Sequence, residues 1–544
     1  MAKKEATYSQ KSSMHDEHKH LFGSGGKSDF IINMSKEATY KLCGIYSMIA
    51  MILVALSAVP YYISKAVSTS DEYMMLRTED NETLAFLIMT LLVAAGFLGL
   101  LIFMICCEKK EIYIAKNKAL LIFVGILVSG LLSTLFADDI GTAFFGYLDR
   151  AEGLITIIGY IGFFAIGMTL TNEAWRKRAA NCIVIIGLVN AIVGILQSIP
   201  ALSDYIPSYY NYLFIDYRTN VDVAEYFNSY AGYDASYAAD GFCCSPFALG
   251  ALLTIAIAFA MSNAVYTNKH LKRLANLFAA GIMTAACILT QTFPAMLGAA
   301  CVLVITLVMA IVNYSKEKKL AAVQLSDKED ADEAESDDEE SEIKAEKYGK
   351  GQIFASVLSI VAAAAIFAGV FLTDNFRMRN EHIMFTDSFE RLGISYEGHS
   401  DHEDGIYPTL WYEGWLCLES NNLLLGIGPD NWTTMYNGGE GMEIDRSYNE
   451  YLDTAITRGL LGAVLYIAML VITLIKAIRI LKTKKSPVAY GAFAAFLGYA
   501  AQAFFNISTA SSTPFFYLTI GLIWSYEAAG KIKIYKKAKS DKKK

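Results

Sequence analysis

Charge is scarce in this chain of 544 residues, and long stretches carry none. Asp, Glu, Lys and Arg make up only 18% of the residues, whereas 54% are hydrophobic. A helix needs roughly 20 apolar residues to cross a hydrocarbon core of about 30 Å, and many segments reach that length. A soluble protein of two or three domains would not carry so many uncharged stretches. Because helices satisfy their own backbone hydrogen bonds in lipid, we predict an all-α, polytopic membrane protein.

The chain also lacks the cysteine patterns of a zinc site or a disulfide framework. None of its nine cysteines forms a CxxC pair. Most lie in or beside apolar stretches, where cysteine behaves as a small hydrophobic residue. Cys243, Cys244 and Cys417 are the ones expected on an oxidising side, which leaves room for one bridge. We expect no metal and no other cofactor.

Twelve apolar stretches are candidate transmembrane helices. They lie near residues 42–64, 84–107, 119–136, 153–170, 181–199, 242–263, 274–291, 294–314, 352–373, 458–480, 488–506 and 514–530. The chain then divides into a disordered polar tail over 1–41, spans one to nine over 42–373 with an acidic insertion near 320–350, a large loop over 374–457, spans ten to twelve over 458–530, and a basic tail over 531–544. The first tail is too long and too polar for a signal peptide.

Lys and Arg cluster in every second loop. They follow the second, fourth, sixth, eighth and tenth spans and fill the tail after the twelfth. Cytoplasmic loops are enriched in Lys and Arg, so both termini are expected in the cytoplasm. The large loop 374–457 is then extracytoplasmic. The acidic run 327–346 falls inside the cell, and we interpret it as a solvated insertion without a catalytic role.

No charged residue stands at the centre of an expected span. Ionisable residues at that depth usually mark ion or proton pathways, so their absence argues against a proton-coupled transporter. Charges gather instead at the outer ends of the spans. Asp149, Arg150 and Glu152 precede the fourth span, and Arg391 and Arg446 belong to the large loop. Arginine offers paired donors that suit phosphate, which indicates chemistry on a phosphorylated substrate at the outer face.

Four motifs carry a resemblance to a known family. They read FFGYLDRAEGLITIIGY at 144–160, LLLGIGPDNW at 423–432, DRSYNEYLDTAITRGLLG at 445–462 and QAFFNISTASSTPFFYLTIGL at 502–522. In order, spacing and sidedness they resemble the O-antigen ligase and O-antigen polymerase superfamily of bacterial membrane glycosyltransferases. The resemblance extends from about residue 42 onward, and it includes the twelve spans and the large outer loop between the ninth and tenth.

The resemblance implies a metal-independent, GT-C-like enzyme of the bacterial plasma membrane. Such an enzyme moves a glycan from an undecaprenyl-pyrophosphate carrier to an acceptor, which is a lipid, a wall polymer or a protein. Nucleic acid is not an expected partner. The implied catalytic residues are Arg150, Arg446, Tyr448, Asn449 and Glu450, with Arg150 and Arg446 holding the pyrophosphate. The implied substrate-binding residues are Arg391, Gly426, Gly428, Trp432, Asp445 and Tyr451.

One position departs from the family pattern. Tyr448 stands where the family usually has a histidine that activates the acceptor hydroxyl. An unperturbed tyrosine has a pKa of about 10, against about 6.5 for histidine, and is a poor base near neutral pH. Three interpretations stay open. Tyr448 positions the substrate while a carboxylate such as Asp445 or Glu450 acts as base; or a loop histidine, His399 or His402, takes that role; or the activity is lost or changed.

Two other functions also stay open. A lipid-linked oligosaccharide flippase or other transporter suits twelve spans, but it predicts a charged central cavity that the sequence does not indicate. A non-catalytic scaffold in envelope assembly suits the tyrosine at position 448 and an acidic insertion that recruits a partner.

Overall fold

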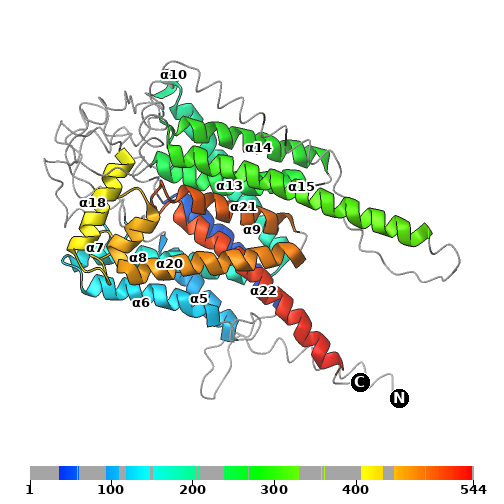
Figure 1. Ribbon diagram of the computed structural model, residues 1–544, viewed down its shortest axis with the longest axis horizontal. Coiled ribbons are helices and arrows are strands. Elements are labelled where there is room, and N and C mark those ends of the chain that lie inside the picture. Colours follow the sequence, from blue (N-terminus) through cyan, green and yellow to red (C-terminus); the bar gives the residue numbers. More distant parts are fainter. Residues whose placement is uncertain are drawn as a thin grey trace.

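The computed structural model describes residues 36–57, 59, 93–108, 118–147, 151–203, 206, 238–243, 245–267, 269–329, 357, 361, 406–432, 446–483 and 486–541. Every regular element within these ranges is a helix (Figure 1). The all-α class is therefore confirmed.

Six helices are long and apolar enough to cross a membrane. They are α2 (Lys36–Ala55), α9 (Glu173–Gln197), α13 (Pro246–Tyr266), α14 (His270–Leu289), α15 (Phe293–Glu329) and α20 (Glu450–Thr483). The other bundle helices are α5 (Ala95–Glu108), α6 (Leu121–Leu135), α8 (Leu154–Thr169), α21 (Pro487–Gln502) and α22 (Thr513–Asp541). Short helices are η2 (Lys118–Leu120), α7 (Ile140–Phe145), α10 (Pro200–Ser203) and α18 (Ile406–Ser420). A helix overlaps each expected span except the ninth, 352–373, which lies outside the described residues apart from positions 357 and 361.

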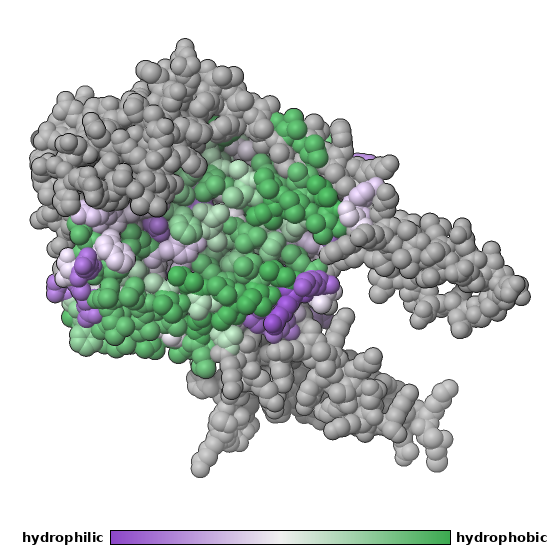
Figure 2. All heavy atoms as spheres, viewed as in Figure 1, coloured by the Kyte–Doolittle hydropathy of each residue, from purple (hydrophilic) through white to green (hydrophobic). Residues whose placement is uncertain are grey.

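The sides of the bundle are apolar. Val124 and Val128 on α6 and Val464 and Ile467 on α20 are all exposed. Figure 2 shows hydrophobic residues spread across the side of the bundle, with hydrophilic residues toward both of its ends. An exposed apolar surface of this extent needs a lipid or protein environment, and the long apolar helices indicate a membrane protein.

Helix α13 is the centre of one half of the bundle. It is buried along its whole apolar length and is packed by α9, α14, α15 and α21. The α8–α22 pair forms the centre of the other half. Their backbones meet at glycines: a Cβ on Gly521 would lie 2.2 Å from the Phe164 carbonyl oxygen, and one on Gly167 would lie 2.4 Å from that of Leu518. Small residues at such crossings let membrane helices approach closely.

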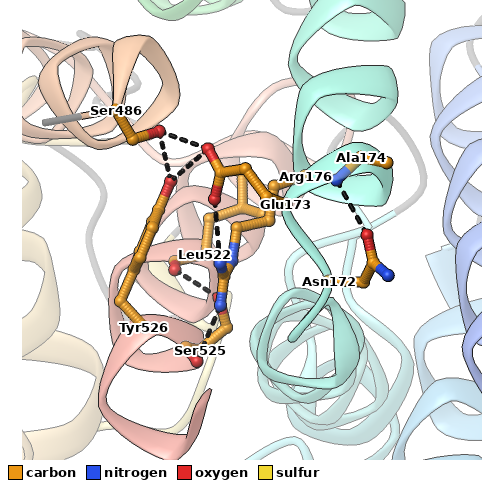
Figure 3. A network of polar contacts seen from close by, with 8 residues as sticks. All are labelled: Asn172, Glu173, Ala174, Arg176, Ser486, Leu522, Ser525 and Tyr526. Atoms are coloured by element: carbon orange, nitrogen blue, oxygen red, sulfur yellow. Dashed lines mark hydrogen bonds and ion pairs between the residues drawn. The ribbon is translucent and has the colours of Figure 1, made fainter. Parts of the chain in front are cut away.

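A polar network ties α9, α21 and α22 together at one end of the bundle (Figure 3). The Arg176 guanidinium donates to the Ser525 hydroxyl (2.8 Å) and carbonyl (2.9 Å) and pairs with Glu173 at 3.0 Å. Glu173 also accepts from Ser486 and Tyr526. Arg176, one of the basic residues that follow the fourth span, is therefore buried and paired inside α9. We call this end, where α9 and α21 begin, the network end.

Candidate active site

The opposite end of the bundle is organised around a break in α20. Gly459 has φ 69° and ψ 176°, a conformation open almost only to glycine, and it divides a nine-residue segment, 450–458, from the long apolar part of the helix. A break frees backbone groups that must find other partners. The loop 423–429, which contains the Gly-x-Gly-Pro turn, docks directly on the break and supplies these partners.

The docking is reciprocal. The amides of Ile427 and Gly428 donate to the carbonyls of Ile456 and Thr457 at 3.0 Å each, and the amides of Leu460 and Leu461 donate back to the carbonyls of residues 423 and 424 at 2.9 and 3.4 Å. Gly426 and Gly428 have φ values of +75° and +101°. The structure gives these two glycines, which were predicted to bind substrate, a structural role: they hold the loop against α20, and neither lines the cavity described below.

The four sequence motifs contribute side chains to one cavity of about 60 Å³ at this end of the bundle, which we call the site end. Its lining is Glu152, Ile157, Tyr160, Pro429, Asp430, Trp432, Arg446, Glu450, Asp453, Thr454, Thr457, Arg458, Ser508, Thr513 and Tyr517. In Figure 1 these residues come from the start of α8, the loop after α18, the start of α20 and the start of α22. The convergence is independent of the resemblance, because the fold alone brings these distant segments together.

Glu152 connects three of the motifs. Its Oε2 accepts from the Ser508 hydroxyl at 2.6 Å, and its Oε1 accepts from the Tyr160 hydroxyl. Arg446 lies close enough to attract its charge, and the Arg446 guanidinium donates to the Ser508 carbonyl at 2.9 Å. Burial nevertheless dominates and raises the pKa of the Glu152 carboxyl above its ordinary value.

Two other carboxylates hold the backbone of the site. Asp430 accepts from the amides of Tyr147 (2.7 Å) and Glu152 (3.2 Å), which joins the GPDNW segment to the turn before α8. Asp453 accepts from the Ser447 amide (2.9 Å) and hydroxyl (2.7 Å), which closes the chain over the start of α20. The bonds to Ser447 also fix the position of the adjacent residue, Arg446.

Arg458 is the second cationic residue of the cavity. Its Nη2 donates to the Thr454 hydroxyl at 2.8 Å, so the side chain runs back along α20 toward Glu450. Helical side chains lean toward the N-terminus, which makes this direction natural. Arg446 and Arg458 thus give the cavity two positively charged side chains.

Glu450 begins α20 and is only 4% exposed. Its Oε1 accepts from the Tyr466 hydroxyl at 2.7 Å. Its Oε2 is buried and accepts no hydrogen bond within the part of the chain that the structure describes. The Tyr499 hydroxyl hydrogen-bonds Thr513 at 3.1 Å and also lies close enough to Glu450 to interact with its carboxylate. A buried oxygen without a partner is uncommon and costly, which marks Glu450 as a functional candidate.

The structure brings some of the predicted residues to the cavity and leaves others outside it. Arg446, Glu450 and Trp432 line it. The Asn449 side chain caps α20 by accepting from the amides of residues 451 and 452, and the Tyr451 hydroxyl donates to the Ala500 carbonyl. Neither of these, nor Tyr448, is among the lining residues. The predicted Arg150, Arg391 and Asp445 lie outside the described residues, as do the alternative bases His399 and His402.

The most informative residue that the sequence predictions missed is Arg458, together with Asp453, Thr454 and Thr457. A signal was available: with Glu450 they are spaced i, i+3, i+4, i+7 and i+8, which places five polar residues on one helix face. Such a stripe is conspicuous just ahead of an apolar span.

No group of three or more His, Cys, Asp or Glu residues with metal-binding geometry occurs among the described residues. The cavity instead presents arginines, carboxylates and hydroxyls, which suit an anionic, sugar-like ligand. No protein-family model matches the chain, and no curated protein sequence matches it significantly. The fold and site define a helical membrane protein with a charge-lined cavity at one end.

Proposed function

We propose that this protein is a glycosyltransferase of the O-antigen ligase type. It would transfer a glycan from undecaprenyl pyrophosphate to an acceptor hydroxyl at the outer face of a bacterial plasma membrane. The observation that carries the proposal is the convergence of all four family-like motifs on one cavity.

The chemistry of the cavity supports this reaction. Pyrophosphate is a good leaving group, so catalysis consists largely of stabilising the charge that develops as the glycosidic bond breaks. Arg446 and Arg458 are placed for that role. Asp430 and Asp453 are occupied by backbone amides, and burial favours the neutral form of Glu152, which limits repulsion of an anion.

The size of the cavity limits what it holds. At about 60 Å³ it is far smaller than the roughly 300–1,000 Å³ typical of pockets that enclose a whole small molecule. We therefore propose that it receives the reacting centre, the anomeric carbon and its phosphate, while the polyprenyl chain and the rest of the glycan lie outside it. Arg150 and Arg391 remain further candidates for the distal phosphate.

The test compares Arg446→Ala and Arg458→Ala with Arg178→Ala. Arg178 is exposed and lies over the Trp175 ring at the network end, so its loss is a matched control for removing a charge. With purified protein and a polyprenyl-pyrophosphate glycan, each cavity variant should lose roughly 10²–10³-fold in transfer rate, the usual effect of removing one charge-stabilising donor. Arg178→Ala should match wild type. Wild-type transfer by both cavity variants would contradict the site.

A flippase is the second candidate, because the cavity is charged. Its position at one end of the bundle, rather than at mid-depth, favours the transferase. The two differ in a strain that lacks the protein: a missing transferase leaves lipid-linked glycan on the outer leaflet, and a missing flippase leaves it on the inner leaflet. A normal glycan profile in an Arg446→Ala strain would point to the scaffold instead.

A further inference from the structure

We propose that Glu450, and not Tyr448, accepts the proton of the attacking acceptor hydroxyl. The inference rests on the proposed glycosyl transfer and names the base of that same site. It goes beyond the motif resemblance, which assigns the role to the position two residues earlier.

The side chain of Tyr448 has a structural role. Its ring packs on Phe247, with 4.9 Å between ring centroids and 57° between planes. It also packs against the apolar cluster that contains Trp432 and Ile456. Its backbone has φ +51°, which turns the chain between Ser447 and the cap residue Asn449. Tyr448 therefore stabilises the start of α20 by packing, and it is not among the residues that line the cavity.

Glu450 has what a base needs, a carboxylate oxygen that is not already committed. Tyr466 orients the group through Oε1, and Oε2 accepts no hydrogen bond of ordinary geometry in the described part of the chain, although the Tyr499 hydroxyl lies near the carboxylate. Leaving a buried polar atom unsatisfied is unfavourable, and a ligand that donates a hydrogen bond to it would remove that cost. An acceptor hydroxyl entering the cavity would do so by donating to Oε2.

The other carboxylates of the cavity are less suited. Both oxygens of Glu152 already accept hydrogen bonds, from Tyr160 and Ser508. Asp430 holds two backbone amides, and Asp453 holds the amide and hydroxyl of Ser447. Proton transfer to Asp453 would weaken the contacts that hold Ser447, the residue next to Arg446. Glu450 can change its protonation state without dismantling the site.

The surroundings of Glu450 come from four elements. The titratable and charged groups facing it are Glu152 before α8, Tyr160 on α8, Tyr451, Arg458 and Tyr466 on α20, Tyr499 on α21, and Tyr517 on α22. Arg458 is the one cation in this set. Because its side chain runs back to Thr454, one turn from Glu450, a base and a phosphate-binding group lie on one face of the same short helix.

The step balances without a cofactor. The acceptor oxygen forms a bond to the anomeric carbon as the bond from that carbon to the pyrophosphate oxygen breaks. The electron pair leaves with undecaprenyl pyrophosphate, whose charge Arg446 and Arg458 stabilise. The hydroxyl proton moves to Glu450 Oε2 and later passes to solvent or to the departing pyrophosphate.

The decisive comparison is Glu450→Gln against Tyr448→Phe, with purified protein, a polyprenyl-pyrophosphate glycan and an alcohol acceptor. General-base loss should lower the transfer rate of the glutamine variant about 10²–10⁴-fold while donor binding is retained. Wild-type transfer should rise with pH as the base loses its proton, and the residual rate of the glutamine variant should be flat over the same range. Tyr448→Phe, which removes the only ionisable group at that position, should keep wild-type transfer and its pH profile.

Tyr466→Phe removes the hydrogen bond to Glu450 and keeps its carboxylate. It therefore separates the effect of losing the base from the effect of disturbing the structure around it. It should cause a smaller loss and preserve the rise with pH. If Glu450→Gln does not fold, Glu450→Asp replaces it, with a lower rate expected and the rise with pH retained. Undiminished transfer by the position-450 variant, or loss confined to Tyr448→Phe, would overturn the assignment. The proposed function fails separately, if wild-type protein transfers nothing or if both arginine variants are fully active.

Discussion

Single residues in the cavity act through chains of contacts. The Ser508 hydroxyl donates to Glu152, and the Ser508 carbonyl accepts from Arg446, so one residue from the last hairpin positions a carboxylate from the first motif and a guanidinium from the third. Glu152 lies at the centre of this arrangement and is partly buried. Its protonation is therefore coupled to the stability of the whole site.

We predict that Glu152→Gln flattens the dependence of stability on pH. Because burial raises the pKa of this carboxyl in the folded protein above its unfolded value of about 4.3, the folded state binds the proton more tightly. The stability it contributes is full below the unfolded pKa and is lost as pH rises through the folded pKa. Thermal unfolding in detergent should show wild-type stability falling from pH 5 to pH 8, with a smaller fall for the glutamine variant. Equal slopes for the two proteins would contradict this.

Sequence patterns predicted some of these residues and not others, for physical reasons. Arg446, Glu450 and Trp432 were predicted because they stand inside recognisable motifs, and they line the cavity. Tyr448 was named because it occupies the position of the family histidine in the motif, but which way its side chain turns depends on its φ and on Phe247, 201 positions earlier in the chain. Arg458 was missed because a positive charge beside an apolar span is usually an interfacial anchor.

At the scale of elements, α20 is the part that makes the site. Its first nine residues carry Glu450, Asp453, Thr454, Thr457 and Arg458, and the break at Gly459 sets their direction apart from the apolar remainder. The freed carbonyl of Thr457 accepts from Gly428 and also from the Ser133 hydroxyl at 2.6 Å. Helix α6, the Gly-x-Gly-Pro loop and α20 are therefore joined at one point beneath the cavity.

We predict that Gly459→Ala disrupts this junction. A Cβ there would lie 2.0 Å from the Leu424 carbonyl oxygen, and the backbone conformation itself costs a non-glycine residue about 1–3 kcal/mol. The variant should unfold at a lower temperature in detergent and lose transfer activity. Gly281→Ala is the matched control, because its Cβ would meet nothing within 4 Å and alanine favours a helix by up to about 1 kcal/mol. Two variants of equal stability would show that the break is not required.

Most elements could be predicted from apolar length, whereas the break could not. The helices at 121–135, 154–169 and 246–266 follow uncharged stretches, and Ser245 with Pro246 is a recognisable helix start. The pattern around Gly459 continues without interruption into the apolar span, so nothing local distinguishes a broken helix from a continuous one. The break exists because a loop 29 to 37 residues earlier supplies the missing hydrogen bonds. The large loop 374–457 stays a prediction outside the described ranges 406–432 and 446–457.

At the scale of the whole molecule, the two ends differ in charge. Following the helices places the described Lys and Arg residues at the network end, with the exception of Arg446 and Arg458 inside the cavity (Figure 1). The network end also contains a partly buried pair between Lys476 and Glu527, with the Lys476 ammonium over the Trp524 ring. By the positive-inside rule this asymmetry favours a cytoplasmic network end and an outer cavity.

We therefore predict opposite labelling of cysteines placed at the two ends. Asp138, exposed between α6 and α7 at the site end, and Arg178, exposed in the first turns of α9, are suitable positions. In a background from which the nine native cysteines have been removed, an impermeant thiol reagent should label Asp138→Cys in intact cells and label Arg178→Cys only after the membrane is opened. Transfer activity of the cysteine-free protein serves as the control for folding.

The reverse pattern would place the cavity in the cytoplasm, where a donor already moved to the outer leaflet cannot reach it, and would exclude the proposed reaction. Labelling of both positions in intact cells would instead contradict a span crossing between them.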